Sequence, residues 1–299
     1  QEVTEDIIVR IAHHAHEITG KDSLCLAGGV ALNAVANGKL LTKTPFKHLY
    51  IQPSAGDGGG ALGAALYAWH VALDNEDRFV MDHAYWGEKF DYHDIEQSIK
   101  DFGITAKYYD NESNLINTVV DYLTDGKIIG WFQDRAEWGP RALGNRSIIA
   151  DPRSNTVKDT INDKIKFREP FRPFAPSVVA EVADQYFDLR SLNQSLASNF
   201  MLMVVPVLDS KQQELQGVCH QGTARIQTVT KESNPRYYKL INSFGNATGT
   251  PVILNTSFNV QGEPIVNSPK DALNTFINSG LDSLVLGDFI INKDDLNIE

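Results

Sequence analysis

The sequence contains little that would indicate a disulfide-bonded or membrane protein. Its two cysteines, Cys25 and Cys219, lie far apart and are too few for the disulfide framework of a small secreted domain. No apolar run approaches the length of a membrane span, and the chain does not open with a signal peptide. These absences predict a reducing environment, a cytoplasmic location and no membrane partner.

An excess of basic residues is also missing, since 38 Asp and Glu residues outnumber 27 Lys and Arg residues and give a formal net charge of −11. A nucleic-acid-binding surface needs clustered positive charge to neutralise phosphates, so we expect no nucleic acid partner. The hydrophobic and charged fractions, 42% and 22%, are ordinary for a globular protein. A chain of 299 residues is long enough for two hydrophobic cores, and we predict two domains.

Positive charge is nevertheless concentrated between Gly126 and Arg172. An apolar run, residues 128–132, leads into a loop with the sequence QDRAEWGPRALGNR, and further cations follow. The glycines and cations to which we give weight are Gly139, Arg141, Gly144, Arg146, Lys166, Arg168 and Arg172. Glycines let backbone N–H groups approach phosphate oxygens, and guanidinium groups bind phosphate or carboxylate oxygens through two hydrogen bonds.

Two interpretations of this segment remain open from the residues alone. The first is a pocket for a small polyanion. The second is a surface on which the arginines form ion pairs with the acidic neighbours Asp134, Glu137, Asp151 and Glu169. Composition does not distinguish between them.

The first part of the chain alternates between helical and extended patterns. Apolar residues at helical spacing predict a helix over residues 1–19. A strand at residues 23–27 is followed by Gly28 and Gly29 and by a helix to about Leu41, an arrangement that presents free backbone N–H groups and a helix dipole to a phosphate or nucleotide. A glycine pair alone is weak evidence for such a site.

A second strand, residues 48–52, ends in the glycine-rich turn PSAGDGGG. Its Asp57 either caps the following helix or ligates a hard cation, and the residues alone favour the cap. The helix at residues 61–71 is rich in small residues, so we expect it to pack tightly on a sheet. Residues 74–93 are polar and predict a linker between the two domains.

The remainder of the chain predicts a mixture of helices and strands around the cationic segment. Helices are expected over residues 94–102, 115–123, 235–244 and 270–279, and strands over residues 128–132, 174–179, 251–254 and 284–291. Directly after the strand at residues 251–254, the run from Asn255 to Asn259 places short hydroxyl and amide groups at the start of a loop.

Several long motifs, in the same order, resemble those of the O-carbamoyltransferases of antibiotic and nodulation-factor biosynthesis, the NodU/CmcH/TobZ family. The motifs are LCLAGGVALNAVANGKLL, QPSAGDGGGALGAALY, GWFQDRAEWGPRALGNRSIIADPR, KFREPFRPFAPSV, GTARIQTV, NPRYYKLI and TPVILNTSFNVQGEPIV, and they extend from Leu24 to Ile291. The resemblance implies an α/β (α+β) fold with a partial actin/Hsp70-like ATPase subdomain followed by a YrdC-like twisted mixed-sheet domain.

By this resemblance, residues 1–85 are the C-terminal half of the ATPase-like carbamoyl-transfer domain and residues 86–299 are the YrdC-like domain that forms carbamoyl-adenylate. The N-terminal half of the first domain is then absent, and we expect a C-terminal fragment without full activity. The family's metal ion, Fe or Mg, would be ligated here by Asp57, with its other ligands in the absent half.

The resemblance also implies the roles of particular residues. Gly28, Gly29, Val30 and Asn33 match the nucleotide-contacting turn of the ATPase-like module. Lys166 and Arg168 match a Lys-x-Arg signature, and Ser257 and Asn259 match a Ser-x-Asn signature, both around the nucleotide of the YrdC-like module. For Ser257 and Asn259, hydrogen bonding to loop backbone groups is the alternative role.

We assign phosphate binding and catalysis to the cations and nucleotide or carbamoyl binding to the polar row. The cations are Arg141, Arg146, Lys166, Arg168 and Arg172, and the polar residues are Asn255, Thr256, Ser257 and Asn259. Preorganised cations, backbone donors and a divalent metal are what phosphoryl chemistry requires.

The family's reaction, as the resemblance implies, starts from carbamoyl phosphate and ATP, forms carbamoyl-adenylate with loss of pyrophosphate, and passes the carbamoyl group to a hydroxyl of a small-molecule acceptor. The expected cofactors are ATP and a divalent metal, and the expected partners are carbamoyl phosphate and the acceptor. The oligomeric state is open, with a homodimer among the alternatives. Two other functions also remain open: a nucleotide-binding module without transfer activity, and a different ATP-dependent adenylating enzyme such as a threonylcarbamoyl-adenylate synthase.

Overall fold

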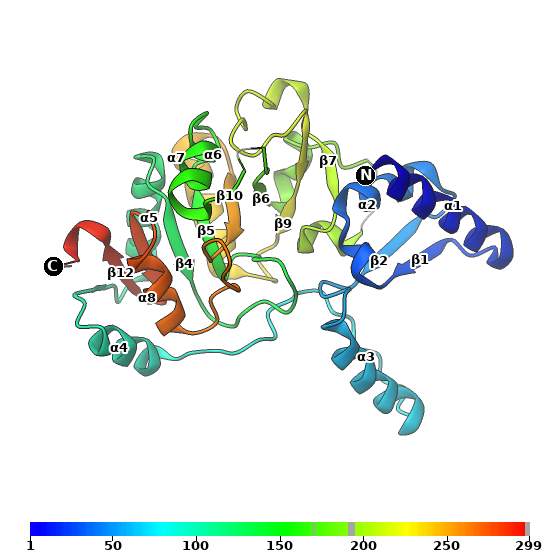
Figure 1. The fold of residues 1–299 in the computed structure, drawn as a ribbon, viewed down its shortest axis with the longest axis horizontal. Helices are drawn as coiled ribbons and strands as arrows, with labels where there is room; N and C mark the ends of the chain where they lie inside the picture. The colour runs from blue at the N-terminus through cyan, green and yellow to red at the C-terminus, as the bar shows by residue number, and fades with distance from the viewer. Residues whose placement is uncertain (170, 191–194, 297–299) are drawn as a thin grey trace.

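The computed structural model describes residues 1–169, 171–190 and 195–296 (Figure 1). The described strands are β1 (Ser23–Leu26), β2 (His48–Ile51), β3 (Lys107–Tyr108), β4 (Ile129–Phe132), β5 (Arg146–Ala150), β6 (Ala175–Val179), β7 (Val204–Pro206), β8 (Thr223–Arg225), β9 (Gln227–Val229), β10 (Val252–Ser257), β11 (Ser283–Leu286) and β12 (Phe289–Asn292). The described α-helices are α1 (Glu2–Thr19), α2 (Ala34–Lys43), α3 (Gly59–Tyr67), α4 (Tyr92–Asp101), α5 (Glu112–Thr124), α6 (Val157–Ile161), α7 (Pro235–Thr248) and α8 (Pro269–Ile277). Together they form a mixed α/β fold, which confirms the predicted fold class.

The largest sheet has eight strands in the order β3-β12-β11-β4-β5-β10-β6-β9. Strand β4 is parallel to β11, and β6 is parallel to β9, while the other pairs in this sheet are antiparallel. Two small sheets accompany it, the parallel pair β1-β2 and the antiparallel pair β7-β8. The sheet is therefore mixed, in agreement with the sequence-based expectation.

Alternating side chains of the large sheet enter two separate hydrophobic cores. On one face, Ile129, Ile149 and Ile253 pack with the apolar sides of α5 and α7. On the other face, Ile148 and Leu254 belong to a larger core that extends into the first part of the chain. This alternation is what a strand with both faces covered requires, because successive side chains point to opposite sides of a sheet.

The first part of the chain is arranged around β1 and β2, with Ser23 opposite His48. Helix α1 ends at Gly20, which has the left-handed conformation (φ 60°) common after the last turn of a helix. Strand β1 leads through Gly28 (φ 100°) and the short 3₁₀ helix Gly29–Leu32 to α2. The Oδ1 of Asn33 caps α2 by accepting a hydrogen bond from the backbone N–H of Ala36 (3.2 Å).

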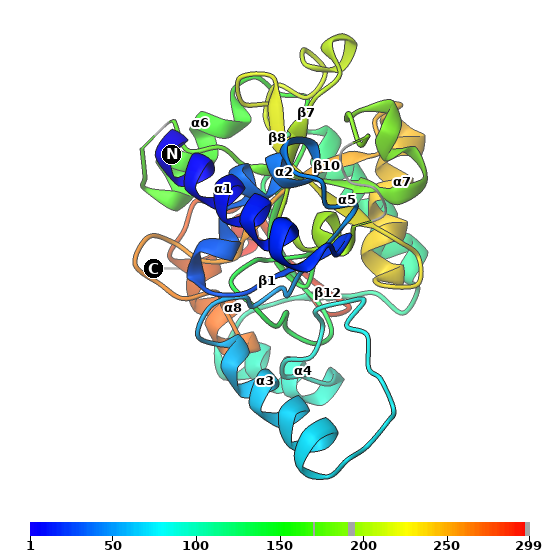
Figure 2. The ribbon, with the colours of Figure 1, turned by 90° about the vertical axis from the view of Figure 1, so that its right-hand side faces the viewer.

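Helix α3 differs from the prediction. It forms where expected, but none of its residues is buried, and it projects away from the sheets together with the π-helical turn Ala68–Ala72 (Figures 1 and 2). Small residues allow close packing, yet the described part of the chain supplies no sheet beneath this helix. Across that part, no helix combines the length and apolar character needed to cross a membrane.

Three further elements differ from the sequence-based expectation. The single strand expected over residues 284–291 is a hairpin, β11 and β12, because Gly287 (φ 60°) allows a tight reversal. Arg146, which we placed in a loop, begins strand β5. Strand β10 continues to Ser257, so that most of the polar row lies on a strand and not in a loop.

Two glycines allow the two parts of the chain to approach closely. A Cβ atom on Gly38 of α2 would lie 2.2 Å from the carbonyl oxygen of Val204 on β7. A Cβ atom on Gly139 (φ 123°) would lie 2.8 Å from the carbonyl oxygen of Pro53. Larger residues at either position would separate the first part of the chain from the loop that contains Arg141.

Candidate active site

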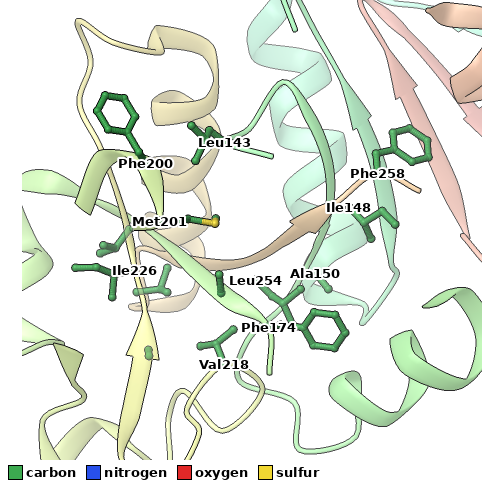
Figure 3. Packing of buried hydrophobic residues seen from close by; sticks show 14 of the residues in the cluster. Leu143, Ile148, Ala150, Phe174, Phe200, Met201, Val218, Ile226, Leu254 and Phe258 are labelled. Atoms are coloured by element: carbon green, nitrogen blue, oxygen red, sulfur yellow. The ribbon is translucent and has the colours of Figure 1, made fainter. Parts of the chain in front are cut away.

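A cavity of about 460 Å³ lies between the start of α2 and the neighbouring strands β10 and β6 of the large sheet. We call it the arginine pocket. Its lining consists of Leu32–Val35 before and within α2, Pro140–Ala142, Arg168, Arg172–Ala175, Met201, Val204, Val218, His220, Thr223–Arg225 and Asn255–Ser257. Phe174, Met201 and Val218 of this lining belong to the core shown in Figure 3, where Phe174 and Val218 lie close to Leu254.

Three guanidinium groups, those of Arg141, Arg168 and Arg225, line this pocket from three different segments. None of the three forms an ion pair with an acidic residue that the structure describes. Each has a buried nitrogen without a hydrogen-bond partner: Nε of Arg141, Nη2 of Arg168 and Nε of Arg225. Buried donors without partners are costly, so this arrangement is suited to an anionic ligand that accepts from all three.

The remaining contacts of these arginines fix their position without neutralising them. Nη2 of Arg141 donates to the carbonyl oxygen of Leu32 (3.3 Å), which connects the pocket to the first part of the chain. Nε of Arg168 donates to Oδ1 of Asn162 (2.8 Å), and its guanidinium carbon lies 4.7 Å from the centre of the Phe174 ring. These neutral partners leave the positive charge available to a ligand.

The charges in the pocket repel one another. Burial, followed by the neighbouring charges of Arg141 and Arg168, lowers the pKa of Arg225 to about 9. Burial also lowers the pKa values of Arg141 and Arg168, and Arg172 contributes to the second of these shifts. A bound phosphate would relieve this repulsion, so part of its binding energy would come from the protein's own unfavourable charge distribution.

The acidic neighbours of the cationic segment are engaged elsewhere. Asp134 pairs with Lys89 (3.0 Å), and Asp151 pairs with Arg153 (2.6 Å). Oε1 of Glu137 accepts hydrogen bonds from the backbone N–H groups of Leu143 (2.7 Å), Asn145 (2.8 Å) and Arg146 (3.2 Å), which holds the loop next to Arg141. The surface ion-pair interpretation therefore applies to Arg153 and, among the five cations to which we gave a role, to Arg172, whose Nε lies 2.9 Å from Glu169.

Arg146 is placed differently from the other predicted cations. It is fully buried and does not line the pocket. Its guanidinium group donates to the carbonyl oxygens of Gln133, Asp134, Asn145, Asn267 and Glu88, and it lies 3.6 Å from the centre of the Phe132 ring. Its donors are satisfied by backbone carbonyls, an arrangement that favours a structural role for Arg146, and its predicted phosphate contact stays a prediction.

Lys166 lies next to the polar row but outside the pocket lining. Its Nζ donates to the carbonyl oxygen of Asn259 (2.8 Å), to Oδ1 of Asn259 (2.7 Å) and to Oγ and the carbonyl oxygen of Ser257 (3.2 and 2.5 Å). Oγ of Ser257 donates to Oδ1 of Asn259 (2.7 Å). The structure thus brings the Lys-x-Arg and Ser-x-Asn signatures together, with Arg168 and Ser257 at the pocket and Lys166 and Asn259 behind it.

Lys166 should make stability depend on pH. Burial, followed by the charge of Arg168, lowers its pKa from 10.5 to about 7. The unfolded chain then binds more protons than the folded chain between pH 7 and 10.5, so raising the pH through this range favours folding. We expect the free energy of unfolding of the wild type, relative to Lys166→Met, to rise between about pH 6.5 and 9 in urea denaturation.

Lys270→Met provides the control, because Lys270 is exposed and pairs with Asp101 (2.9 Å). This variant should keep the pH dependence of the wild type. A Lys166→Met protein with the same pH dependence as the wild type would show that Lys166 remains charged in the folded state.

The residues predicted in the first part of the chain reach the pocket only in part. Asn33 lines it, whereas Gly28, Gly29 and Val30 do not. Asp57 is exposed, and no three His, Cys, Asp or Glu side chains of the described residues are grouped so that they could hold a metal ion. These residues therefore do not form a complete metal site, and the metal role of Asp57 stays a prediction.

Two pocket residues were missed in the assignment from sequence. Arg225 lies within the motif GTARIQTV, which contributed to the family resemblance but whose arginine received no role. His220 was left without a role, and it lines the same cavity. Arg225 is the only charged residue in this motif, and that could have identified it. A cation in a buried strand needs a specific partner.

These features define an α/β protein with a buried cationic pocket suited to phosphate groups. A family model described as "Carbamoyltransferase C-terminus" matches residues 120–293, and one described as "Carbamoyltransferase N-terminus" matches residues 1–66. The chain belongs to the carbamoyltransferase family.

The chain is similar to several curated proteins over almost its whole length. It is 44% identical to nodulation protein NolNO of Sinorhizobium fredii, over 98% of this chain and 43% of that protein. It is 42% identical to nodulation protein NolO of Bradyrhizobium diazoefficiens, over 98% of this chain and 53% of that protein. A 3'-hydroxymethylcephem-O-carbamoyltransferase of Amycolatopsis lactamdurans is 30% identical, over 96% of this chain and 52% of that protein.

The chain thus spans about half the length of the curated relatives that it matches. Among solved structures, full-length HypF in its phosphate- and nucleotide-bound form aligns with a TM-score of 0.41 and 16% identity, over 64% of this chain and 22% of that chain. This similarity is too low to support a conclusion about the fold or the site.

Proposed function

We propose that the arginine pocket binds carbamoyl phosphate and the phosphates of ATP and forms carbamoyl-adenylate, the donor for carbamoylation of a small-molecule hydroxyl group. The observation that carries this proposal is the convergence of Arg141, Arg168 and Arg225 on one cavity without acidic partners among the described residues. Phosphoryl-transfer enzymes rely mainly on positioning and on cations that stabilise charge on phosphate oxygens.

The proposed chemistry has three balanced steps. Water cleaves carbamoyl phosphate to carbamate and inorganic phosphate. A carbamate oxygen then attacks the α-phosphorus of ATP, and pyrophosphate leaves. Finally, the acceptor hydroxyl attacks the carbamoyl carbon, so that AMP leaves and a proton is released. In the first two steps negative charge shifts onto leaving phosphate groups, which is where the three guanidinium groups act.

Family membership supports the transferred group, and the similarity to a cephem O-carbamoyltransferase supports a hydroxyl acceptor. Because the chain spans about half of such relatives, we propose adenylate formation for this chain and complete transfer for a protein of their full length. A divalent metal would supply further charge neutralisation on the nucleotide phosphates, and its ligands are not assembled from the described residues.

Pyrophosphate–ATP exchange tests this function. We expect exchange that depends on carbamoyl phosphate in the wild type and its loss in Arg168→Ala, because one lost contact to the reacting phosphoryl group costs about 3–4 kcal/mol of transition-state stabilisation. Arg10→Ala is the control, since Arg10 is exposed and pairs with Asp6 on α1. Exchange that persists in Arg168→Ala would contradict the assignment.

Thermal stability measurements separate the proposed function from its alternatives. ATP with carbamoyl phosphate should raise the melting temperature, and threonine with bicarbonate and ATP should raise it no more than ATP alone. The opposite order would favour threonylcarbamoyl-adenylate synthesis. Stabilisation by ATP alone, without exchange, would indicate a nucleotide-binding module.

A further inference from the structure

Asn255 lines the arginine pocket, and its side-chain amide has one of its two polar atoms engaged and the other without a partner. Asn255 is 1% exposed and lines the cavity. Its Nδ2 lies 2.9 Å from Oε1 of Gln227, 3.1 Å from Oγ of Ser177 and 3.2 Å from the carbonyl oxygen of Ala142. Its Oδ1 is buried and has no hydrogen-bond partner.

The hydrogen-bond network determines which way this amide faces. The carbonyl oxygen of Ala142 can only accept, so it requires the amide nitrogen on its side. Nε2 of Gln227 donates to the carbonyl oxygen of Leu143 (2.7 Å), which leaves Oε1 of Gln227 as an acceptor facing Asn255. Ser177 donates its hydroxyl proton to the same Oε1 (2.6 Å), so its Oγ is also an acceptor toward Asn255. Rotating the amide by 180° would place oxygen against these three acceptors.

Oδ1 of Asn255 is therefore a fixed acceptor that needs a donor from outside the protein. A buried acceptor without a partner costs roughly 1–3 kcal/mol, and a ligand that supplies a donor recovers this cost. Asn37 provides a comparison: it is equally buried and its Oδ1 also has no partner, but it does not line the pocket. The position of Asn255 at the cavity distinguishes it from Asn37.

The pocket thus combines three cations that have no acidic partner among the described residues with one buried acceptor, Oδ1 of Asn255, that has no donor. The cations require an anion, and the acceptor requires an N–H or O–H group on the same ligand. Carbamoyl phosphate has a phosphate at one end and an amino group at the other. We propose that Oδ1 of Asn255 accepts a hydrogen bond from the carbamoyl amino group and thereby selects carbamoyl phosphate over acyl phosphates that have a methyl group in its place. This inference rests on the proposed function.

A stable pair of ligands tests the selection directly. Phosphonoacetamide and 2-oxopropylphosphonate have the same phosphonate and carbonyl groups and differ in an amino group against a methyl group. We expect calorimetric titration of the wild type to show about tenfold to hundredfold tighter binding of phosphonoacetamide, because the methyl compound leaves Oδ1 unpaired. Equal affinities would overturn the inference, and this measurement does not depend on any variant folding.

Asn255→Leu should remove the difference between the two ligands while both still bind through the arginines. A residue with only a structural role would weaken both ligands by the same factor and leave their ratio unchanged. Asn37→Leu is the matched control, because it removes a similarly buried amide, whose Nδ2 donates to the carbonyl oxygens of Ala31 (2.8 Å) and Leu202 (3.0 Å). Its ligand ratio should equal that of the wild type.

The outcomes separate this inference from the proposed function. Tight but equal binding of both phosphonates would overturn the role of Asn255 and leave the arginine pocket as a phosphate site. Failure of both phosphonates and of inorganic phosphate to bind would overturn the proposed function as well. A preference for phosphonoacetamide that persists in Asn255→Leu would assign the selection to another group.

Discussion

Arg225→Ala is expected to weaken binding of carbamoyl phosphate by about 2–4 kcal/mol and to abolish pyrophosphate exchange. Arg225 lies on β8 and lines the pocket, where its guanidinium group has no described acidic partner and a buried Nε without an acceptor. A charge-assisted hydrogen bond to phosphate in such a water-excluded place is strong. Its loss should raise Kd and lower the exchange rate together.

The same substitution should leave the stability of the unliganded protein unchanged or increase it. Arg141 and Arg168 both lower the pKa of Arg225, which shows that the three charges repel one another. Removing one of them relieves this repulsion, so the melting temperature without ligand should not fall, and the increase on adding carbamoyl phosphate should largely disappear. Calorimetric titration and thermal unfolding with and without ligand measure both effects.

Arg135→Ala is the control for Arg225→Ala. Arg135 belongs to the same cationic segment as Arg141, is exposed, and donates from Nη1 to the carbonyl oxygen of Gly87 (3.0 Å) outside the pocket. Its removal lowers the net charge by the same amount and should leave ligand affinity within about twofold. Equal losses of affinity in the two variants would mean that the protein attracts phosphate by its overall charge and not through the pocket.

Arg146→Met is expected to lower the free energy of unfolding by about 3–5 kcal/mol, since it removes a fully buried cation and leaves its partners unpaired. Methionine fills much of the volume but cannot donate to the carbonyl oxygens of Gln133 (2.7 Å) and Asp134 (3.1 Å). Those oxygens would then be buried without hydrogen bonds at the start of the loop that leads to Arg141. Urea denaturation measures the loss.

Arg146→Lys should recover part of this stability, because one ammonium group can still donate to one or two of the carbonyls. At temperatures where Arg146→Met is folded, its affinity for carbamoyl phosphate should stay within a few fold of the wild type. Normal stability combined with a large loss of affinity would instead place Arg146 among the ligand-binding residues.

The contrast between Arg141 and Arg146 shows what the sequence could not provide. Both arginines follow glycines in one short motif, and nothing in their spacing separates them. In the structure, Arg146 begins strand β5, and its side chain donates hydrogen bonds to backbone carbonyl oxygens. Arg141 remains in the loop and lines the cavity. The difference depends on where the strand begins and on which carbonyls lie nearby, both of which are consequences of tertiary packing.

Local patterns predicted much of the secondary structure. The spacing of apolar residues identified the helices now seen as α1, α4, α5, α7 and α8, because an amphipathic helix must place its apolar residues on one side. The hairpin β11–β12 was missed because both of its strands are apolar and the reversal is only two residues long. The packing expected for α3 was wrong because composition indicates that a helix can pack but not what it packs against.

By itself, the sequence determined the α/β class, the family and the concentration of cations next to a polar row, because these depend on residue order and local periodicity alone. Only the tertiary structure decided which cations share a cavity, that Arg225 completes the set, and that Arg146 is part of the core. The reason is that a pocket is formed by segments far apart in the chain, here from Leu32 to Ser257, whose approach depends on sheet order and on close contacts such as that of Gly38 with Val204.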